Sequence, residues 1–240
     1  MPNPLKIEAF SHPRFARTGN YLKSRRYVEF LILIIDSTND RAIYSPMSKG
    51  EETKQTIVDQ ALELVSTVGL DKLTIGALAN ATGMSKSGLF AHFKSKEQLQ
   101  LRVLEEARER FVDVVVRPAL KEPRGEARLR AIFERTMNEW EEALPGGCVF
   151  HAVAAELDDQ PGPARDYLVE IQRAQREMLA RATRMAIDTG ELRADLDVDQ
   201  FVFELVSITG AFHHFGRLLG DPNATRYARR AFESLLARAH

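Results

Sequence analysis

The segment from Ser85 to Lys96 combines residue types that could bind the phosphate backbone of a nucleic acid. It contains three lysines and no acidic residue. Ser85 is placed to cap a short helix that begins with Lys86, Ser87 and Gly88, and the free N–H groups and dipole of a helix N-terminus favour phosphate. Gly88 inside that helix costs about 1 kcal/mol relative to alanine, which a close approach of the backbone to DNA would explain. The segment therefore predicts DNA binding; the alternative is a solvated lysine edge on a small helical domain.

Residues suited to other common chemistries are present but poorly spaced. His213 and His214 are adjacent, so on a helix they point about 100° apart and cannot share one metal ion. His151 and Glu156 are five positions apart, which is also a poor spacing for a shared metal. We find no Ser/His/Asp pattern and no phosphate-binding glycine loop. We therefore expect neither an enzyme nor a metal or other cofactor.

Composition and charge describe an ordinary globular chain whose parts differ. The 240 residues are 44% hydrophobic and carry a net charge of −1. The longest apolar run, Phe30–Ile35, is far shorter than the roughly 20 residues that span a membrane, and the single cysteine fits a reducing compartment. The formal charge is +3 for residues 1–46, 0 for 47–100 and −4 for 101–240. The net charge near zero is therefore the sum of a basic, a neutral and an acidic segment.

The elements that must position the lysine-containing segment are helices. Ser48-Lys-Gly-Glu51 has the spacing of a capping box, and apolar residues with helical period follow it up to Gly69. Thr74 then caps a short second helix, and Gly83 separates it from the third helix, which Ser85 caps. Three helices in this order, two of them short and joined by a tight turn, predict a helix-turn-helix domain.

The rest of the chain is also predicted to be helical. Ser95-Lys-Glu-Gln98 is a second capping box, and it opens a long helix that Pro118 and Pro123 end. Pro- and Gly-containing turns separate further helical stretches, expected at about 125–143, 148–159, 163–189, 198–219 and 223–238. No segment alternates with period two for long enough to propose a strand. The expected fold class is therefore all-α, with the long helix joining an N-terminal helix-turn-helix domain to a C-terminal helical domain.

A resemblance to a known family rests on segment 74–99, which reads TIGALANATGMSKSGLFAHFKSKEQL. In residue type and spacing it resembles the DNA-binding motif of the TetR family of bacterial transcriptional regulators, over about residues 51–111. The resemblance implies a homodimer on a palindromic double-stranded DNA operator, and a repressor that an unidentified small-molecule effector releases. It also implies a bacterial cytoplasmic protein, associated with the nucleoid and not with a membrane. The alternatives are an activator, a regulator without a ligand and, more remotely, a helical enzyme.

Each position of the motif has an implied role. The resemblance assigns Lys86, Ser87 and Gly88 to base edges in the major groove and Ser85 to the cap of the recognition helix. Phe90 stands where the family usually has a phosphate-binding tyrosine, so we expect its ring to pack instead. The residues expected at or near phosphates are Thr74, His92, Lys94 and Lys96. A packing role for His92 and solvated charges at Lys94 and Lys96 are the alternatives.

Two late helices are the expected dimer surface. Residues 198–219 are apolar on more than one face, which a helix in a monomer rarely satisfies. The resemblance implies that this helix and the next pair with their counterparts in a four-helix interface. The expected interface residues are Phe201, Leu205, Ile208, Phe212, Phe215, Tyr227, Ala231 and Leu235. The alternative is burial of these side chains within one chain.

The resemblance also implies an effector site among the helices of the C-terminal domain. The candidates are aromatic, sulfur or imidazole side chains: Trp140, Cys148, Phe150, His151, Met178 and His213. A mostly apolar cavity with one or two polar groups is the usual small-molecule site, although each candidate is equally compatible with ordinary core. Cys148 would be a redox sensor if a helix N-terminus lowered its thiol pKa; the alternative is a buried, inert thiol.

Residues 1–47 read differently from the rest. They contain scattered prolines and arginines without a persistent period, and they end at Met47, directly before the first helix. We interpret them as a disordered or non-native extension that precedes a natural start at Met47; the alternative is a genuine basic arm. The expected domains are then the helix-turn-helix domain at 48–100 and the ligand-binding and dimerisation domain at 101–240.

Overall fold

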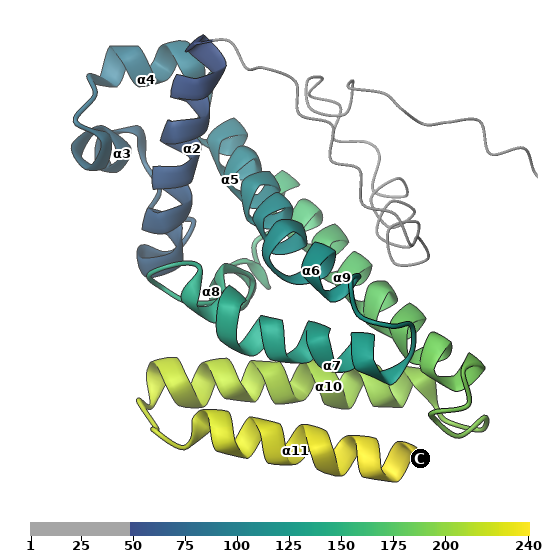
Figure 1. Cartoon of the computed structure of the whole chain (residues 1–240). Helices are drawn as coiled ribbons and strands as arrows, with labels where there is room; N and C mark the ends of the chain where they lie inside the picture. Colours follow the sequence, from purple (N-terminus) through teal and green to yellow (C-terminus); the bar gives the residue numbers. More distant parts are fainter. Residues whose placement is uncertain (1–48) are drawn as a thin grey trace, which may run out of the picture.

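The computed structural model describes residues 49–240, apart from a few individual side chains (Figure 1). Every regular element within that range is a helix. The predicted all-α fold class is therefore confirmed. The expectations for an extension at 1–47 and for a helix cap at Ser48 fall outside the described residues.

Three helices form a small head at one end of the molecule (Figure 1). α2 (Lys49–Val68) is followed by two short helices, α3 (Ile75–Thr82) and α4 (Lys86–His92). Apolar side chains from all three helices and their connections close a common core, and the buried members include Leu62, Leu73, Leu78, Leu89 and Phe93. The head has the helix-turn-helix arrangement that the sequence predicts.

Local hydrogen bonds explain where the two short helices begin. Thr74 Oγ1 accepts a hydrogen bond from the backbone N–H of Ala77 at 3.0 Å, and Ser85 Oγ accepts one from the N–H of Gly88 at 3.1 Å. Between the helices, Gly83 has φ +67°, a left-handed conformation that glycine adopts without the steric cost of a side chain. These three residues set the angle at which α4 leaves α3.

One long helical segment connects the head to the rest of the chain, which we call the body. α5 (Lys96–Phe111) continues without a break through the π-helical segment η1 (Val112–Val116) into the short α6 (Arg117–Ala119). The Ser95 hydroxyl caps its start, as predicted. α5 packs against α2 of the head and against α9 (Pro163–Asp188) of the body, so it belongs to both.

The remaining helices build the body, and their bounds agree with the predicted stretches to within a few residues. α10 and α11 lie side by side across the end of the molecule opposite to α3 and α4 (Figure 1). The elements are α7 (Glu126–Arg135) with the π-helical η2 (Thr136–Trp140), α8 (Val149–Leu157), α9, α10 (Val198–His213) with the π-helical η3 (His214–Leu218), and α11 (Ala224–Ala239).

The last helix is held tightly to the body. The rings of Phe133 on α7 and Phe232 on α11 stack with their centroids 3.9 Å apart. On the rim of this contact, Arg229 pairs with Glu134 at 2.8 Å. Stacked buried rings stabilise a helix pair beyond the area that they bury, so one face of α11 is committed to its own chain.

Candidate functional site

The first turn of α4 presents small and cationic side chains to solvent. Ser85, Lys86 and Ser87 are exposed, and Gly88 is half-buried. The Ser85 hydroxyl accepts the N–H of Gly88 and lies 3.2 Å from the Ser87 hydroxyl. The turn therefore offers hydroxyl and ammonium donors with little steric bulk, which is what contact with base edges in a groove requires.

Gly88 has a local reason to be glycine in addition to the predicted approach of DNA. A Cβ at this position would lie 3.2 Å from Ser85 Oγ and 3.8 Å from Met84 Cε. The first distance is tighter than ordinary van der Waals contact, so a larger residue would press on the serine that caps the helix. Glycine lowers the helix propensity at position 88, but it leaves room for the Ser85 side chain that caps the helix.

Two of the predicted DNA contacts, Thr74 and Lys86, both have side-chain atoms near Gly76 in the first turn of α3. A Cβ built on Gly76 would lie 3.8 Å from both Thr74 Oγ1 and Lys86 Cε. The Lys86 side chain of α4 therefore extends toward the start of α3, the helix that Thr74 caps.

The two lysines that follow α4 differ in their surroundings. Lys94 is exposed. Lys96 Nζ lies 2.5 Å from the backbone carbonyl oxygen of Asp71 and 3.0 Å from its carboxylate, so this cation has a partner within the chain. Both side chains are exposed, and such surface pairs contribute only about 0–1 kcal/mol, so a phosphate could compete with the carboxylate.

His92 and Phe90 occupy the end of α4. His92 is half-buried, and its ring lies 6.5 Å from the Phe93 ring. The side chain of Phe90 is outside the described part of the structure, so its expected packing remains a prediction.

Two further lysines of the head were missed as candidates. Lys72 is exposed in the turn that leads to the Thr74 cap, and Lys54 Nζ lies 5.9 Å from the centroid of the Phe93 ring, beside the end of α4. The sequence could have indicated Lys72, because this residue stands two positions before Thr74, the predicted helix cap. The position of Lys54 depends on how α2 crosses α4.

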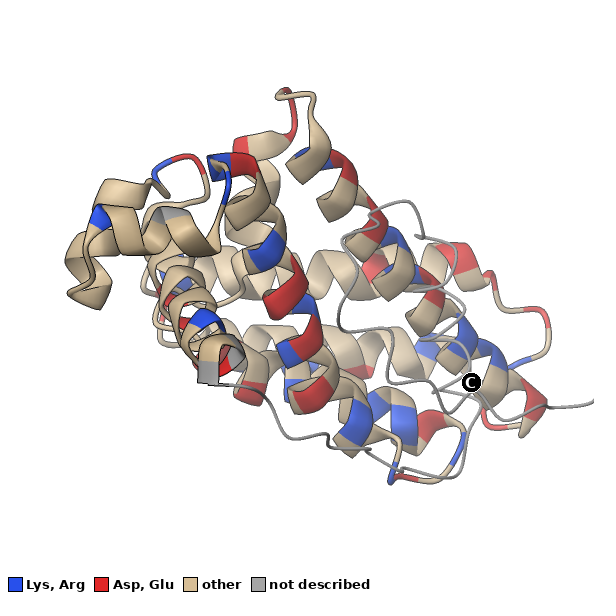
Figure 2. Cartoon of the chain, turned by 90° about the horizontal axis from the view of Figure 1, so that it is seen from above, with Lys and Arg blue, Asp and Glu red and all other residues tan. Residues whose placement is uncertain are grey.

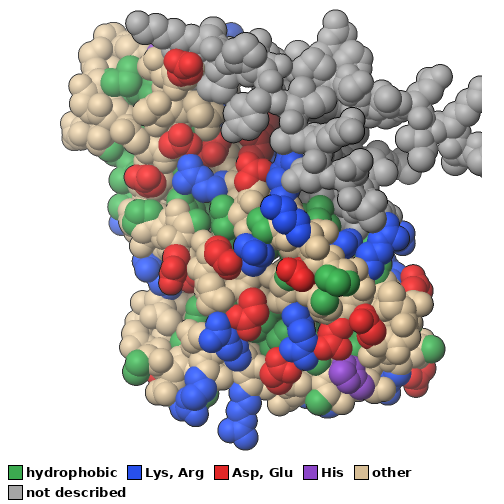
Figure 3. Space-filling view, in the orientation of Figure 1, with side chains coloured by type: hydrophobic (Ala, Val, Ile, Leu, Met, Phe, Trp, Pro, Cys, Tyr) green, Lys and Arg blue, Asp and Glu red, His purple; other side chains and the backbone are tan. Residues whose placement is uncertain are grey.

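Charge over the rest of the molecule is mixed. Acidic and basic positions are interspersed along the helices of the body (Figure 2). The same mixture of side chains covers the body on the face shown in Figure 3. A protein that binds DNA without regard to sequence needs many phosphate contacts, and the face of the described residues that Figure 3 shows has no extended basic surface to supply them.

At the opposite end of the molecule, α10 and α11 enclose an apolar groove of about 370 Å³. The lining includes five of the predicted dimer residues: Ile208, Phe212, Phe215, Tyr227 and Ala231. Outside the groove, Phe203 is 67% exposed and Leu218 is 73% exposed. This end of the described chain therefore carries apolar surface that a monomer leaves in water.

Three of the predicted dimer residues do not lie on the surface, so the prediction that they form the interface needs correction. Phe201 and Leu205 of α10 and Leu235 of α11 are buried inside their own chain. The physical reason is rotation about the helix axis: α10 turns the face with Phe201 and Leu205 toward the body and the face with Phe203 outward. Four further exposed apolar residues, Phe203 and Val206 on α10 and Leu218 and Leu219 after it, are not among the predicted interface residues.

Five of the six predicted effector residues form one cluster inside the body. The ring of Trp140 stacks on that of Phe150 with centroids 5.5 Å apart, and its Nε1–H donates to Cys148 Sγ at 3.2 Å. The rings of His151 and His213 stack at 5.4 Å. We call these five residues the aromatic–imidazole cluster. Met178 is buried on α9.

Glu141 completes the cluster and was missed from the sequence. Its Oε1 lies 2.9 Å from His213 Nδ1, and its Oε2 accepts the backbone N–H of Cys148 at 3.2 Å. Burial lowers the pKa of His151, and neighbouring His213 lowers it further, while Glu141 acts in the opposite direction. The cluster thus joins an apolar surface to a carboxylate and two imidazoles.

Cys148 is a free, buried cysteine, which agrees with the inert thiol and not with an exposed redox sensor. Cys148 is the N-cap residue of α8, the position that lowers a thiol pKa when the thiol is exposed. Burial raises the pKa of this thiol to about 11, and the hydrogen bonds from the backbone and Trp140 offset burial only in part. A raised pKa keeps the thiol mostly protonated at neutral pH, and the thiolate is the nucleophilic form.

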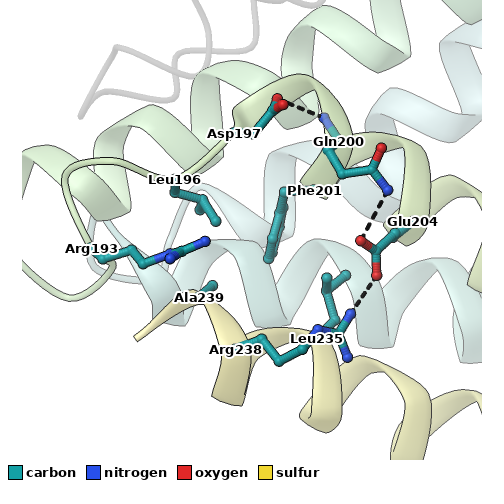
Figure 4. A pocket seen from close by; sticks show the side chains of 9 residues that line it. All are labelled: Arg193, Leu196, Asp197, Gln200, Phe201, Glu204, Leu235, Arg238 and Ala239. Carbon is teal, nitrogen blue, oxygen red and sulfur yellow. Dashed lines mark hydrogen bonds and ion pairs between the residues drawn. The ribbon is translucent and has the colours of Figure 1, made fainter.

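A small hollow of about 90 Å³ lies between α10 and the end of α11 (Figure 4). Its polar groups are already engaged: Arg238 pairs with Glu204, which also accepts from the Gln200 amide at 3.1 Å, and Asp197 caps α10. None of the predicted effector residues lines it. We assign no ligand to this hollow.

Two negative findings apply to residues 49–240. No group of three or more His, Cys, Asp or Glu side chains in this range could hold a metal ion. No helix among these residues has the length and apolar character needed to cross a membrane.

The head and the two paired final helices define the class of protein to which the chain belongs: a helix-turn-helix DNA-binding regulator with a helical body. Comparison with known families agrees. The model for bacterial regulatory proteins of the tetR family matches residues 57–103, and the model for tetracyclin repressor-like C-terminal domains matches residues 125–232.

Individual relatives and solved structures agree with this assignment. The HTH-type transcriptional repressor KstR2 of Mycolicibacterium smegmatis is 26% identical over 152 residues, 59% of this chain and 70% of that protein. A TetR-family regulator from Cytophaga hutchinsonii superposes with a TM-score of 0.73 at 20% identity over 82% of this chain and 98% of the other. AibR, solved with isovaleryl coenzyme A and operator DNA, superposes with a TM-score of 0.63 at 18% identity over 76% and 97%.

The chain belongs to the TetR family and is a DNA-binding transcriptional regulator. The resemblance carried by segment 74–99 is thereby confirmed. Its relatives are regulators of transcription.

Proposed function

We propose that the protein is a homodimeric, ligand-responsive repressor in the bacterial cytoplasm, and that it binds a near-palindromic operator on the nucleoid. The observation that carries the proposal is the exposed first turn of α4, from which Lys86 extends toward the start of α3. Lys86, Ser87 and Gly88 contact base edges, and Thr74 and Lys94 contact phosphates. Lys96 reaches a phosphate after exchanging its Asp71 partner, and His92 lies near the backbone. Repression, rather than activation, is supported by a relative that is itself a repressor.

Dimerisation is proposed through the end of the molecule that carries the α10–α11 groove. Phe203, Phe215, Leu218 and Tyr227 expose apolar surface there, and Ile208, Phe212 and Ala231 line the groove between the helices. A second copy that presents the same surface covers this face in a symmetric contact. Such a dimer carries two heads, one for each half-site of one operator.

The aromatic–imidazole cluster is the proposed effector site. Three π-helical turns border it: η1 begins directly after Phe111, η2 ends at Trp140, and η3 begins directly after His213. The Phe111 ring meets the Trp140 ring edge-on at a centroid distance of 5.3 Å. π-helical turns often occur at functional sites, because their widened backbone is readily repacked. An apolar molecule with one polar group matches the side chains that surround this point.

Footprinting tests the DNA-binding part of the proposal. Full-length protein is bound to DNA flanking its own gene and probed with DNase I. We expect protection of one palindromic site, and we expect Lys86→Ala to lose it. Lys121→Ala removes an exposed lysine of the body and serves as the matched control. Uniform coating of the DNA, or protection that is unchanged in Lys86→Ala, would contradict the proposal.

Fluorescence tests the effector part, because Trp140 is the one tryptophan of the chain and lies in the cluster. A panel of aromatic and aliphatic carboxylates, their coenzyme A thioesters and uncharged aromatic compounds is titrated against the protein. A true effector changes the Trp140 emission and releases the operator over the same concentration range. A compound that releases DNA without changing the emission places the effector site elsewhere.

A further inference from the structure

Helix α8 of the body is fastened to the DNA-binding head near its C-terminal end. The Glu156 carboxylate accepts the backbone N–H of Leu70 at 2.7 Å through Oε2, and its Oε1 accepts the N–H of Asp71. These two amides belong to the turn between α2 and α3, more than 80 positions away in the sequence. Hydrogen bonds to an ionised carboxylate are about twice as strong as neutral ones, so this contact is a strong link between distant segments.

The turn is shaped to receive this carboxylate. Gly69 has φ +87°, and a Cβ on it would lie 2.8 Å from Glu156 Oε2. The Leu70 side chain is fully buried in the head, and the Leu70 carbonyl accepts the Gln100 amide of α5 at 3.1 Å. Asp71 pairs with Lys96 at the start of α5. A shift of Glu156 is therefore passed to a turn that is anchored on all sides.

A second contact fastens the loop before α8. The backbone N–H of Gly146 donates to Ser66 Oγ of α2 at 3.0 Å. A Cβ on Gly146 would overlap the Ser66 carbonyl, so the two backbones are in direct contact. The same loop is held from the dimer side, because Arg217 of η3 donates to the Pro145 carbonyl at 2.9 Å. The head is thus attached to α8 and its preceding loop at two points.

α8 also carries part of the proposed effector site. Phe150 stacks on Trp140, and His151 stacks on His213 of α10. The helix that bears these rings is the one whose Glu156 holds the α2–α3 turn. From that turn the chain passes through Lys72 directly to Thr74, the cap of α3. A displacement of α8 is therefore transmitted to the DNA-reading helices through few covalent and hydrogen bonds.

We propose that Glu156 is a positioning residue: it sets the orientation of the head relative to the body, and hence the separation of the two recognition helices in the dimer. This inference rests on the proposed function, in which two heads bind one operator. Glu156 touches no DNA; it acts through the N–H groups of Leu70 and Asp71. Its substitution changes the spacing of half-sites that the protein prefers, in addition to its affinity.

The first experiment measures head orientation without DNA. Spin labels are attached at Ala81→Cys on α3 and Gln172→Cys on α9, both exposed positions, while buried Cys148 stays unlabelled. Glu156→Gln keeps the side-chain length but replaces one carboxylate oxygen by a donor that faces an N–H. We expect the label-to-label distance distribution to broaden and its mean to shift. Asp159→Asn, an exposed carboxylate three residues further on, is the matched control and leaves the distribution unchanged.

The second experiment selects operators from a library in which two fixed half-sites are separated by spacers of different lengths. We expect Glu156→Gln to lose about tenfold in affinity for the wild-type spacer and to select a different or broader set of spacers. Glu156→Asp, which keeps the charge, recovers part of the wild-type preference. Thermal unfolding of each variant shows whether the fold is intact.

The outcomes separate the inference from the proposed function. If wild-type protein selects no DNA, the proposed function fails, and the distance measurement alone decides the role of Glu156. If Glu156→Gln retains both the wild-type distance distribution and the wild-type spacer preference, the inference is wrong and Glu156 is only a local cap of the turn. Equal loss of affinity at every spacer length, with an unchanged distance distribution, also overturns it.

Discussion

The recognition surface depends on small side chains more than on many charges. At the start of α4, Ser85 holds the helix cap, and Gly88 leaves room for it. Few cations lie nearby, and one of them, Lys96, forms an ion pair with Asp71. Binding that rests on few phosphate contacts has a shallow salt dependence and relies on the fit to bases.

Gly88→Ala tests this dependence on space. The added methyl group lies in the first turn, which we propose to contact DNA, 3.2 Å from Ser85 Oγ. The gain of about 1 kcal/mol in helix propensity offsets the crowding, so we expect little change in Tm. We expect operator affinity in fluorescence anisotropy to fall about tenfold, because the close approach to bases is lost. Affinity for non-operator DNA should be unchanged; an equal loss on both DNAs would show that the head is damaged as a whole.

A buried carboxylate links the head to the connecting helix. Glu106 on α5 accepts the Gln55 amide of α2 at 2.5 Å and lies 3.7 Å from Arg110, which also pairs with Asp59 at 2.9 Å. Burial raises the pKa of Glu106, the Gln55 hydrogen bond opposes this shift, and the nearby Asp59 adds to it. The folded protein therefore binds this proton more tightly than the unfolded chain does.

The sign of that shift predicts how Glu106→Gln behaves with pH. As pH rises through the window between the unfolded value of 4.5 and the higher folded pKa, wild type loses stability at this group and the variant does not. The Tm of Glu106→Gln minus that of wild type should therefore increase from about pH 4 to pH 7, measured by circular dichroism. Glu122→Gln, at an exposed position, is the control. A difference that does not depend on pH would contradict the assignment.

At the scale of elements, the close contact between α2 and the loop before α8 decides how head and body sit together. Gly146 lies against the Ser66 carbonyl, and its N–H is satisfied by the Ser66 hydroxyl. Buried backbone approaches of this kind leave no space for a side chain, and overpacking costs about 1–3 kcal/mol. The two elements can separate only if this contact breaks.

In Gly146→Ala, the added methyl group is expected to push the loop before α8 away from Ser66 of α2. We expect Tm to fall by about 2–12 °C, as a loss of about 1–3 kcal/mol produces in a chain of this size. Operator affinity should fall with it, because the head changes its orientation. Gly50→Ala, at a position with no atom within 4 Å of the added Cβ, should retain both values. Wild-type Tm in Gly146→Ala would show that the loop relaxes freely.

At the scale of the whole molecule, opposite ends carry different tasks. α3 and α4 lie at one end, and the apolar face of α10 and α11 lies at the other (Figure 1). α5 and α8 join them, and both contact α2 of the head. The proposed function requires the far end to dimerise, because a single head would make few contacts with DNA.

Phe203→Glu tests the role of the apolar end. A charge at this exposed position cannot be buried in a symmetric contact, so we expect a monomer in sedimentation velocity with unchanged helical content. Operator affinity should fall about a hundredfold or more, because the second half-site no longer binds as part of the same particle. Gln172→Glu adds the same charge on α9 and should remain dimeric. A dimer of Phe203→Glu would place the interface on another surface.

Local rules made much of this protein predictable from its sequence. Each helix cap and tight turn depends on residues within four positions of one another, so it can be recognised in a short segment. Examples are the caps at Thr74, Ser85 and Ser95 and the turn at Gly83. The helical period of the apolar residues and the Pro- and Gly-containing turns predicted the bounds of the body helices to within a few residues. The motif at 74–99 then identified the family.

Contacts between distant segments were decided only by the tertiary structure. The rotation of α10 determines that Phe201 is buried and Phe203 is exposed, and a helix apolar nearly all round does not reveal which face turns inward. Burial, not its position at a helix N-terminus, determines the high pKa of Cys148. Glu156 finds its partners across more than 80 residues. Sequence alone thus determined the elements and the reading motif, because their causes are local; packing decided which surfaces meet, because those energies depend on groups that only the fold brings together.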